Sequence, residues 1–426
     1  MSEAAAATRP QETVILLGTD TPIGLAVVRD LGRHGYRTIG IGRRANALAG
    51  ASRHCFRHHA RADGEAGLIA QILALAGQHQ ARWLLTVGES DILLLNRHRA
   101  ELEARLQVLA PRSELLMQVL DKATCQRHAE AVGIAVPQTW RFASLAEARA
   151  AAPGLRYPVV LKWSDPHVVA AALDAAGLAL VKTGYARDAA DLLGQLAPYE
   201  AVGAFPLVQE YCPGHGLGQM FLVRDGEVLL EFQHERIHEW PPEGGASTLC
   251  RSVPLAHHGE ARAQARALLR RLGWTGVAMV EYRYDRRSRR YVFMEINGRF
   301  WGSLPLAMAA GLPFAAALVA HCAIPHGSAA ESAPAGNAEA RVPLPRDYPV
   351  LTACYWIPET KRLLRVLFQR RRIQDPFFRP DPLRSLLSYL VFPLRPSARW
   401  FIFQLSDPKP FFSDLAGVFR KLLGRT

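Results

Sequence analysis

Two glutamates, an asparagine and an arginine interrupt two apolar stretches that otherwise have the composition of strands. Glu295, Asn297 and Arg299 stand at alternate positions in YVFMEINGRFWGS, and Glu281 stands in the preceding stretch, GVAMVEYRYD. A carboxylate is costly to bury unless a cation or a hydrogen-bond donor meets it. The partner of these acids should therefore identify the chemistry of the site.

The two stretches are predicted to form one hairpin, because the short basic segment RRSRR connects them. A turn centred on Ser288 places Glu281 opposite Glu295, with Asn297 on the same face two residues further along. Two opposed carboxylates repel unless a cation lies between them. Two carboxylates and one amide suit Mg²⁺, which keeps water or phosphate oxygens in its other positions. In the alternative interpretation, the carboxylates pair with nearby arginines on a solvated sheet edge.

Two lysines earlier in the chain favour the magnesium interpretation. Lys162 follows the apolar run YPVVL, so its stem is expected to lie beside a strand, and a buried ammonium group needs an anion. Lys122, after LMQVLD, could by itself be an ordinary lysine on a helix surface. Two ammonium groups on one side and Mg²⁺ on the other would balance the charge of a phosphate chain, as phosphoryl transfer requires.

The N-terminal part of the chain has the pattern of a doubly wound α/β domain. A strand, the turn GTDTPIG, an amphipathic helix and a second strand form a predicted βαβ unit, and the alternation continues to residue 112. The turn lacks the spacing of a dinucleotide-binding fingerprint, and Arg43 and Arg44 stand where a ribose-binding acid would be expected. We interpret residues 13–112 as a structural or substrate-binding domain. The alternative, a Rossmann oxidoreductase with a nicotinamide cofactor, finds little support.

The rest of the chain mixes helices with antiparallel strands, so the predicted fold class is α/β and α+β. A helical stretch begins near residue 113, and a hairpin is predicted to turn at Asp225 and Gly226. The predicted organisation is a disordered tail (1–12), the N-terminal domain (13–112), a second domain (113–325), a small-residue linker (326–340) and a basic, apolar C-terminal extension (341–426).

The order of these motifs resembles that of the ATP-grasp superfamily, which includes D-alanine–D-alanine ligase, biotin carboxylase and the large chain of carbamoyl-phosphate synthetase. The likeness spans residues 13–325 and rests on Lys122 in DK, Lys162 in YPVVLKW, QEY at 209–211, Glu281 and MEINGR at 294–299. It implies that the doubly wound domain is followed by a two-lobed ATP-grasp fold with a lid lobe at about 138–205.

The resemblance implies a binding site for ATP between the two lobes. Lys122 and Lys162 would contact the phosphates. Main-chain groups of the linker between the lobes would bind adenine, and this segment consists of Gln209, Glu210, Tyr211 and Cys212. The family usually has an acid for the ribose hydroxyls a few residues later. Leu217 and Gly218 occupy those positions here, and His215 is the nearby polar side chain.

The resemblance also implies the metal and catalytic groups. Glu281 and Glu295 would hold Mg²⁺, and Asn297 would complete the shell of a second ion, with Mn²⁺ able to replace Mg²⁺. Arg299 would face the γ-phosphate or an acyl phosphate. Arg236, in HERIHEW, would stabilise the phosphorylated intermediate; its alternative is an exposed arginine on a strand.

The implied reaction joins a small-molecule carboxylate to an amine in two steps. ATP phosphorylates the carboxylate, and the amine then displaces phosphate from the acyl phosphate. A closing lid would keep water out. The segment PPEGGAST (241–248) is interpreted either as a mobile loop near the substrate or as an ordinary turn. The alternatives are a carboxylase or thiol ligase with the same fold, and a non-catalytic sensor that binds ATP without turnover, which the retained acids, amide and Arg299 oppose.

The net charge of +13 is concentrated near the C-terminus. Residues 341–426 carry 16 Lys or Arg and 6 Asp or Glu, so the remaining chain is nearly balanced and nucleic acid is not an expected partner. The C-terminal mixture of basic and apolar residues suits two interpretations. It could lie on an anionic membrane surface, or it could pack as helices on the body of the enzyme.

The cysteines and the apolar runs predict the location of the protein. The six cysteines include no CxxC pair, which is typical of reduced thiols in the cytoplasm. The N-terminus lacks the pattern of a signal peptide, and no run approaches the roughly 20 apolar residues that span a bilayer. We expect a cytoplasmic protein, with peripheral contact at the inner membrane surface through 341–426 as the alternative. The oligomeric state is left open, and a homo-oligomer is one of the options.

Overall fold

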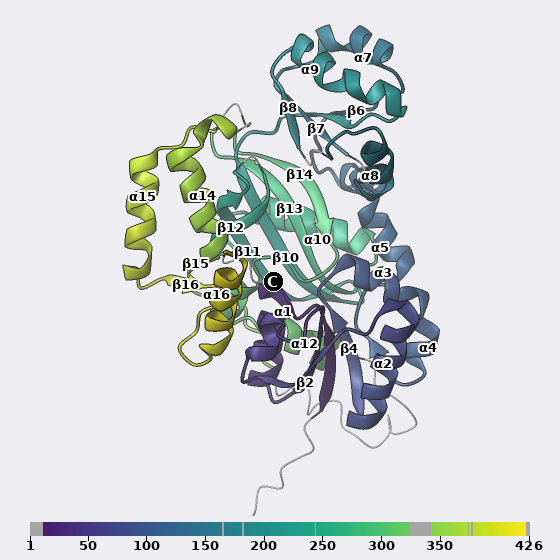
Figure 1. Ribbon diagram of the computed structural model, residues 1–426, viewed down its shortest axis with the longest axis vertical. Coiled ribbons are helices and arrows are strands. Elements are labelled where there is room, and N and C mark those ends of the chain that lie inside the picture. The colour runs from purple at the N-terminus through teal and green to yellow at the C-terminus, as the bar shows by residue number, and fades with distance from the viewer. Residues whose placement is uncertain are drawn as a thin grey trace, which may run out of the picture.

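The computed structural model describes residues 12–163, 166–180, 183–242, 244–323, 342–373, 375 and 378–422. The predicted linker at 326–340 and all of the predicted tail except Glu12 lie outside the described residues. The described strands form three sheets, and the chain passes through them in order from the N-terminus (Figure 1). The predicted combination of α/β and α+β structure is confirmed.

The first sheet is parallel, with strand order β3-β2-β1-β4-β5. Its elements are β1 (Thr13–Leu17), α1 (Pro22–Arg33), β2 (Arg37–Gly42), η1 (Leu48–Ala51), β3 (Cys55–Ala60), α2 (Gly64–His79), β4 (Ala81–Thr86), α3 (Glu89–Arg97), α4 (Arg99–Glu103) and β5 (Gln107–Val108). The central strand β1 is entirely buried, as helices on both faces of a parallel sheet require. A side chain at Gly24 would place its Cβ 2.4 Å from the Gly18 carbonyl oxygen, so this glycine allows α1 to start close to the strand end.

The second sheet forms a separate lobe at the top of the molecule (Figure 1). It is antiparallel, with order β6-β9-β7-β8. Its elements are β6 (Thr139–Trp140), α7 (Leu145–Ala151), η2 (Ala152–Gly154), β7 (Val159–Lys162), α8 (Pro166–Ala175), β8 (Gly184–Ala186), α9 (Ala189–Leu196), η3 (Ala197–Val202) and β9 (Leu207–Glu210). The segment after Lys162 contains helix α8. Closure of this lobe over a substrate stays a prediction.

The third sheet is the largest, with order β14-β13-β10-β11-β12-β15-β16. Its strands from the predicted ATP-grasp segment are β10 (His215–Arg224), β11 (Glu227–Trp240), β12 (Ala246–Ser252), β13 (Gly276–Asp285) and β14 (Arg290–Asn297). The predicted hairpin between β10 and β11 is confirmed. Asp225 and Gly226, with φ of 51° and 80°, form a two-residue turn of the kind in which both residues need positive φ.

Each face of the large sheet is covered by a different set of helices. One face packs against α5 (Ser113–Leu120), α6 (Lys122–Glu130) and α10 (Gly259–Arg271) through a core that includes Trp274 and Phe293. The other face packs against α11 (Leu304–Ala309), α12 (Phe314–Cys322) and α1 of the first domain through a core that includes Met220, Met279 and Phe232. The second face therefore looks toward the N-terminal domain.

The C-terminal segment completes the large sheet. Its elements are β15 (Thr352–Cys354), α14 (Trp356–Phe368), η5 (Arg370–Arg372), α15 (Pro382–Val391), η6 (Phe392–Leu394), β16 (Ala398–Trp400) and α16 (Lys409–Leu422). β15 pairs with β12, and β16 pairs with β15. Of the two interpretations from the sequence, packing on the body is what the structure shows for the inner side of this segment. Among the described residues, no helix has the length and apolar composition that a membrane span needs.

Candidate active site

The predicted pairing of the two glutamates is confirmed. β13 and β14 are antiparallel, with Glu281 directly opposite Glu295. Between the acid pair and the turn, however, the pairing register differs by one residue from that of a regular hairpin centred on Ser288. Tyr282 pairs with Phe293, and Asp285 pairs with Arg290. Met294 is an extra residue on β14, and this irregularity restores the register that makes the two acids cross-strand partners.

Asn297 adds an amide beside the acid pair. The residue is buried, and its Nδ2 donates to Glu295 Oε1 over 3.1 Å. This bond leaves the amide oxygen as an acceptor for another group. Within the described part of the chain, no three His, Cys, Asp or Glu side chains gather as a metal site by themselves. A cation here would thus have two carboxylates and one amide oxygen, a set that fits Mg²⁺ with phosphate or water oxygens in its remaining positions.

Arg236 is the nearest cation to the acid pair. It lies on β11, on the same face of the sheet, and its guanidinium donates to Glu281 Oε2. Its other terminal nitrogen lies 3.5 Å from Glu239 Oε1. Burial lowers the pKa of Arg236, but the charges of Glu281, Glu239 and Glu295 outweigh this effect and raise the pKa overall. Arg236 is therefore a partly buried, permanently charged group that contacts two carboxylates and is stabilised by the charge of a third.

Glu281 shows that this arrangement carries an excess of negative charge. Burial and the neighbouring Glu295 raise the pKa of Glu281 to about 7, although Arg236 opposes the rise. A carboxyl group whose charged form is destabilised to this extent lacks sufficient cationic partners. An additional cation at the acid pair would satisfy both carboxylates, and a metal ion of oxygen preference fits this need.

The two predicted phosphate lysines lie together and near the acids. Lys162, the last residue of β7, points its Nζ at Gln209 Oε1 over 3.5 Å, and Lys122 Nζ donates to the Trp163 carbonyl oxygen over 3.2 Å. Burial and the charge of Lys122 lower the pKa of Lys162, whereas Glu295 and Glu281 raise it. Two ammonium groups that repel each other form a site for an anion.

Replacing Lys162 with methionine is expected to weaken ATP binding by roughly 10- to 100-fold, the value of a hydrogen bond to a charged group. Because the pKa of Lys162 is lowered, affinity in the unaltered protein should decline with rising pH before an ordinary lysine would lose its proton. Titration calorimetry with ATP measures both effects. Lys361→Met on α14 is the control, because Lys361 is an exposed lysine outside this group; equal affinities in the two variants would contradict the role of Lys162.

The segment predicted to bind adenine connects the lobe to the large sheet. It runs from Gln209 and Glu210 at the end of β9 to the start of β10. The Glu210 carboxylate accepts from the Gln138 amide and from Arg290, each over 3.1 Å, so its side chain braces the connection. Tyr211 donates to Asp375 over 3.4 Å. Burial raises the pKa of the Cys212 thiol to about 11, which makes it a poor nucleophile and fits a structural position.

His215 is the predicted site residue that the structure does not bring to this group. His215 directly precedes Gly216, which lies with Gly218 on the sheet face of the acid pair. Because neighbouring residues of a strand point to opposite faces, the His215 side chain lies on the other face of the sheet. There its Nε2 is 3.3 Å from Glu235 Oε1, and its ring packs edge-on against Tyr284. This placement gives His215 a buried acid as its partner, and we do not retain it as a ribose ligand.

Arg299 reaches a partner that the sequence did not indicate. Its Nε donates to Glu89 Oε1 over 2.9 Å, and Glu89 is the first residue of helix α3 in the N-terminal domain. The predicted γ-phosphate ligand is thus held across the boundary between the domains. The signal available in the sequence was weak, because Glu89 follows a glycine after a buried strand, a common place for ligand-binding residues in α/β folds.

The glycine-containing loop between β11 and β12 touches the same group. Arg236 donates to the Gly245 carbonyl oxygen over 3.4 Å. Gly244 has a φ of 125°, which other residues rarely adopt, and a Cβ at Gly245 would lie 2.2 Å from the Trp240 carbonyl oxygen, so both positions favour glycine. Of the two interpretations of this loop, its position beside Arg236 favours the one that places it near the substrate.

Comparison with known proteins gives a short match in sequence and longer matches in structure. The family model for the ATP-binding domain of the carbamoyl-phosphate synthase L chain matches residues 252–324, a range that contains the acid pair and Asn297. No curated protein matches the sequence. The chain spans 28% of the length of pyruvate carboxylase from Rhizobium etli, a solved structure with 16% sequence identity and a TM-score of 0.54 over 73% of this chain.

Three other solved structures are similar over most of both chains. A biotin carboxylase from Campylobacter jejuni in a beta-gamma-ATP complex has 16% identity and a TM-score of 0.56, covering 74% of this chain and 72% of that one. An ADP complex of N5-carboxyaminoimidazole ribonucleotide synthetase has 18% identity and a TM-score of 0.56, covering 75% and 78%. An L-amino acid ligase from Bacillus licheniformis has 13% identity and a TM-score of 0.53, covering 72% and 73%. The predicted resemblance is confirmed at the level of architecture: this chain has the fold of the ATP-grasp superfamily.

Proposed function

We propose that this protein is an ATP-dependent ligase that activates a carboxylate as an acyl phosphate and joins it to an amine. One observation carries the proposal. Glu281 and Glu295 are direct cross-strand partners on the sheet face that also bears Arg236, and their charges act on Lys162. Opposed acids whose charges reach a neighbouring pair of lysines suit a metal–triphosphate better than any single anion or cation.

Each group has a defined task in this proposal. Lys122 and Lys162 would bind the phosphate chain, and Glu281, Glu295 and the Asn297 oxygen would hold Mg²⁺. The bound ion would supply positive charge to neutralise the triphosphate. A carboxylate of the substrate attacks this phosphate and forms the acyl phosphate, and ADP is released. The amine nitrogen then attacks the acyl carbon, phosphate leaves with the bonding electrons, and the amine loses a proton to give the amide.

The arginines complete the site on the substrate side. Arg236, partly buried and charged at every accessible pH, would offset the negative charge of the acyl phosphate. Arg299 would turn from Glu89 toward the phosphate when the substrate binds. The loop around Gly244 and Gly245 would order over the substrate and exclude water from the reactive intermediate. We also propose a cytoplasmic location, which suits six free cysteines.

The solved relatives support both the proposal and its nearest rival. The likeness to an L-amino acid ligase supports a ligase, while the likeness to a biotin carboxylase supports a carboxylase. Retention of both acids, the amide and two arginines in one group favours turnover over simple sensing of ATP.

A screen for ADP release tests the proposal. The full chain is incubated with Mg-ATP, pools of carboxylates that include amino acids, and pools of amines, with Glu295→Gln as the blank. ADP that requires both pools, together with an amide detected by mass spectrometry, supports the ligase. ADP release that requires bicarbonate instead identifies a carboxylase. ATP binding without ADP in any pool identifies a sensor and overturns the proposal.

A further inference from the structure

The outer side of helix α15 is apolar and exposed. No residue of α15 is buried, and the helix is the outermost element on its side of the molecule, separated from the sheet by α14 (Figure 1). Leu394, at the end of the following turn η6, is 80% exposed. Within α15, Leu383, Leu387 and Leu390 follow one another at intervals of four and three residues, and they are 67%, 53% and 60% exposed. This spacing keeps them on one side of a helix.

The orientation of this side is set by contacts on the inner side. The Tyr389 hydroxyl bonds to Trp356 Nε1 and to Thr360 Oγ1, both on α14. Helix α14 is in turn fixed to the sheet through Glu359, which is buried and bonds to His238 of β11 and Thr248 of β12. The leucines therefore face solvent because the helix is held in place. An exposed apolar surface of this kind usually marks an interaction site.

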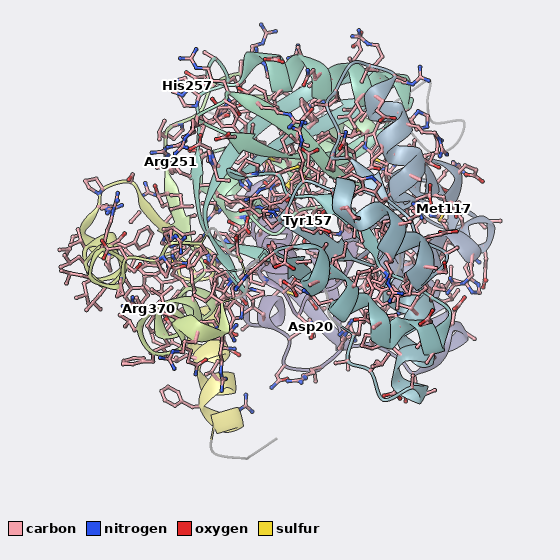
Figure 2. All side chains as sticks on the ribbon, turned by 90° about the horizontal axis from the view of Figure 1, so that it is seen from above. Asp20, Met117, Tyr157, Arg251, His257 and Arg370 are labelled. Atoms are coloured by element: carbon pink, nitrogen blue, oxygen red, sulfur yellow. The ribbon has the colours of Figure 1, made fainter. Side chains whose placement is uncertain are left out.

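Arginines border the leucines. Arg370, Arg371 and Arg372 form an exposed turn just after α14, whose last residue, Phe368, is 77% exposed. Arg384 lies on α15 itself, between the first two leucines, and Arg395 directly follows Leu394. In the view from above, Arg370 marks this side of the molecule, and Met117 lies on the opposite side (Figure 2).

We propose that this surface, the leucine side of α15 with the arginines at its edges, binds an anionic phospholipid membrane. Leucines would enter the boundary between headgroups and acyl chains, and arginines would bind the phosphates around them. A second copy of the chain is disfavoured as the occupant, because a symmetric dimer through this side would bring the same arginines together. The helix would lie along the membrane surface, and the lid lobe and acid pair would stay outside the contact.

Sedimentation of the full chain with vesicles tests this proposal. Vesicles of phosphatidylcholine alone are compared with vesicles that also contain phosphatidylglycerol, at low and high salt. The protein is expected to pellet with the anionic vesicles at low salt, and binding should weaken with salt. Deletion of 341–426 is unsuitable, since it would remove two strands of the large sheet.

Two sets of surface variants separate the apolar and the charged parts. The first changes Leu383, Leu387 and Leu390 to serine, and its control changes three exposed apolar residues elsewhere, which are Met117, Val168 and Val350. The second changes Arg370, Arg371 and Arg372 to glutamine, and its control changes three exposed arginines elsewhere, which are Arg270, Arg271 and Arg287. Each test set is expected to lower binding at least about tenfold, while the controls bind as the unaltered chain does.

Three results would overturn the proposal. The protein could stay in solution with both kinds of vesicle, or either test set could bind as well as its control. Sedimentation equilibrium gives the third: self-association that the leucine variant loses, without vesicle binding, would assign the surface to a second copy. ADP release by the variants in solution should equal that of the unaltered chain, which keeps this test independent of the proposed reaction.

Discussion

Replacing Glu295 with glutamine should lower ADP release by on the order of 10²–10³-fold, the usual effect of removing one group that stabilises charge in a reaction site. Glutamine keeps an oxygen to accept from Asn297 Nδ2, so the local hydrogen bond survives. What is lost is one of two opposed negative charges that would hold Mg²⁺. Steady-state ADP release at saturating Mg-ATP measures the effect, and Glu281→Gln should behave alike.

The unfolding temperature distinguishes this result from a folding defect. Relief of the repulsion between Glu281 and Glu295 means that Glu295→Gln should not lower the unfolding temperature of the protein without metal. Glu227→Gln, an exposed acid at the start of β11, is the matched control and should retain full activity. Activity of Glu295→Gln close to that of the control would remove the acid pair from the mechanism.

Replacing Arg29 with methionine is expected to destabilise the protein by about 3–5 kcal/mol, the cost of leaving a buried charge without its partner. Arg29 on α1 and Asp407 are both 1% exposed, and Nε lies 2.9 Å from Oδ2. Arg29 also donates to the carbonyl oxygens of Ile402 and Asp407. The substitution would leave Asp407 buried without its ion-pair partner, between the N-terminal domain and the C-terminal segment. Denaturant unfolding measures the loss of folding free energy.

The neighbouring arginine supplies the control for this experiment. Arg33 lies one turn further along α1, is exposed, and donates to Gln404 in the same segment. Arg33→Met should cost less than about 1 kcal/mol. If both variants unfold alike, the buried pair does not fasten the C-terminal segment.

The same ion pair predicts how stability depends on pH. Burial raises the pKa of Asp407, but hydrogen bonds from Ser52, Arg53 and Arg29 outweigh it and lower the pKa overall. A carboxyl group with a lowered pKa in the folded state contributes stability above its unfolded pKa, which is about 3.9. That contribution is lost as the pH falls through the lowered value, and Arg29→Met should show a weaker loss on acidification.

Much of the architecture could be predicted from local patterns. Alternation of strands and helices indicated the doubly wound domain, and the Asp225-Gly226 turn indicated a hairpin, because both signals depend on residues close together in the chain. The acid pair was also predicted, through a symmetric turn. The structure reaches the same pair by a different route, with an extra residue at Met294. The bulge breaks the alternation of β14, because Phe293 and Ile296 lie in the same core although they are three residues apart. The apolar run VFMEI does not show which of its residues is the extra one.

The sequence by itself determined which chemistry this protein carries: opposed acids, an adjacent amide and two lysines, at spacings that local strand and helix geometry converts into faces. The tertiary structure alone decided which partners those groups meet. It placed Glu89 of the first domain on Arg299, directed His215 away from the acids, and joined the C-terminal segment to the large sheet. These contacts join residues far apart in the chain, and they depend on how whole domains pack, which local periodicity does not encode.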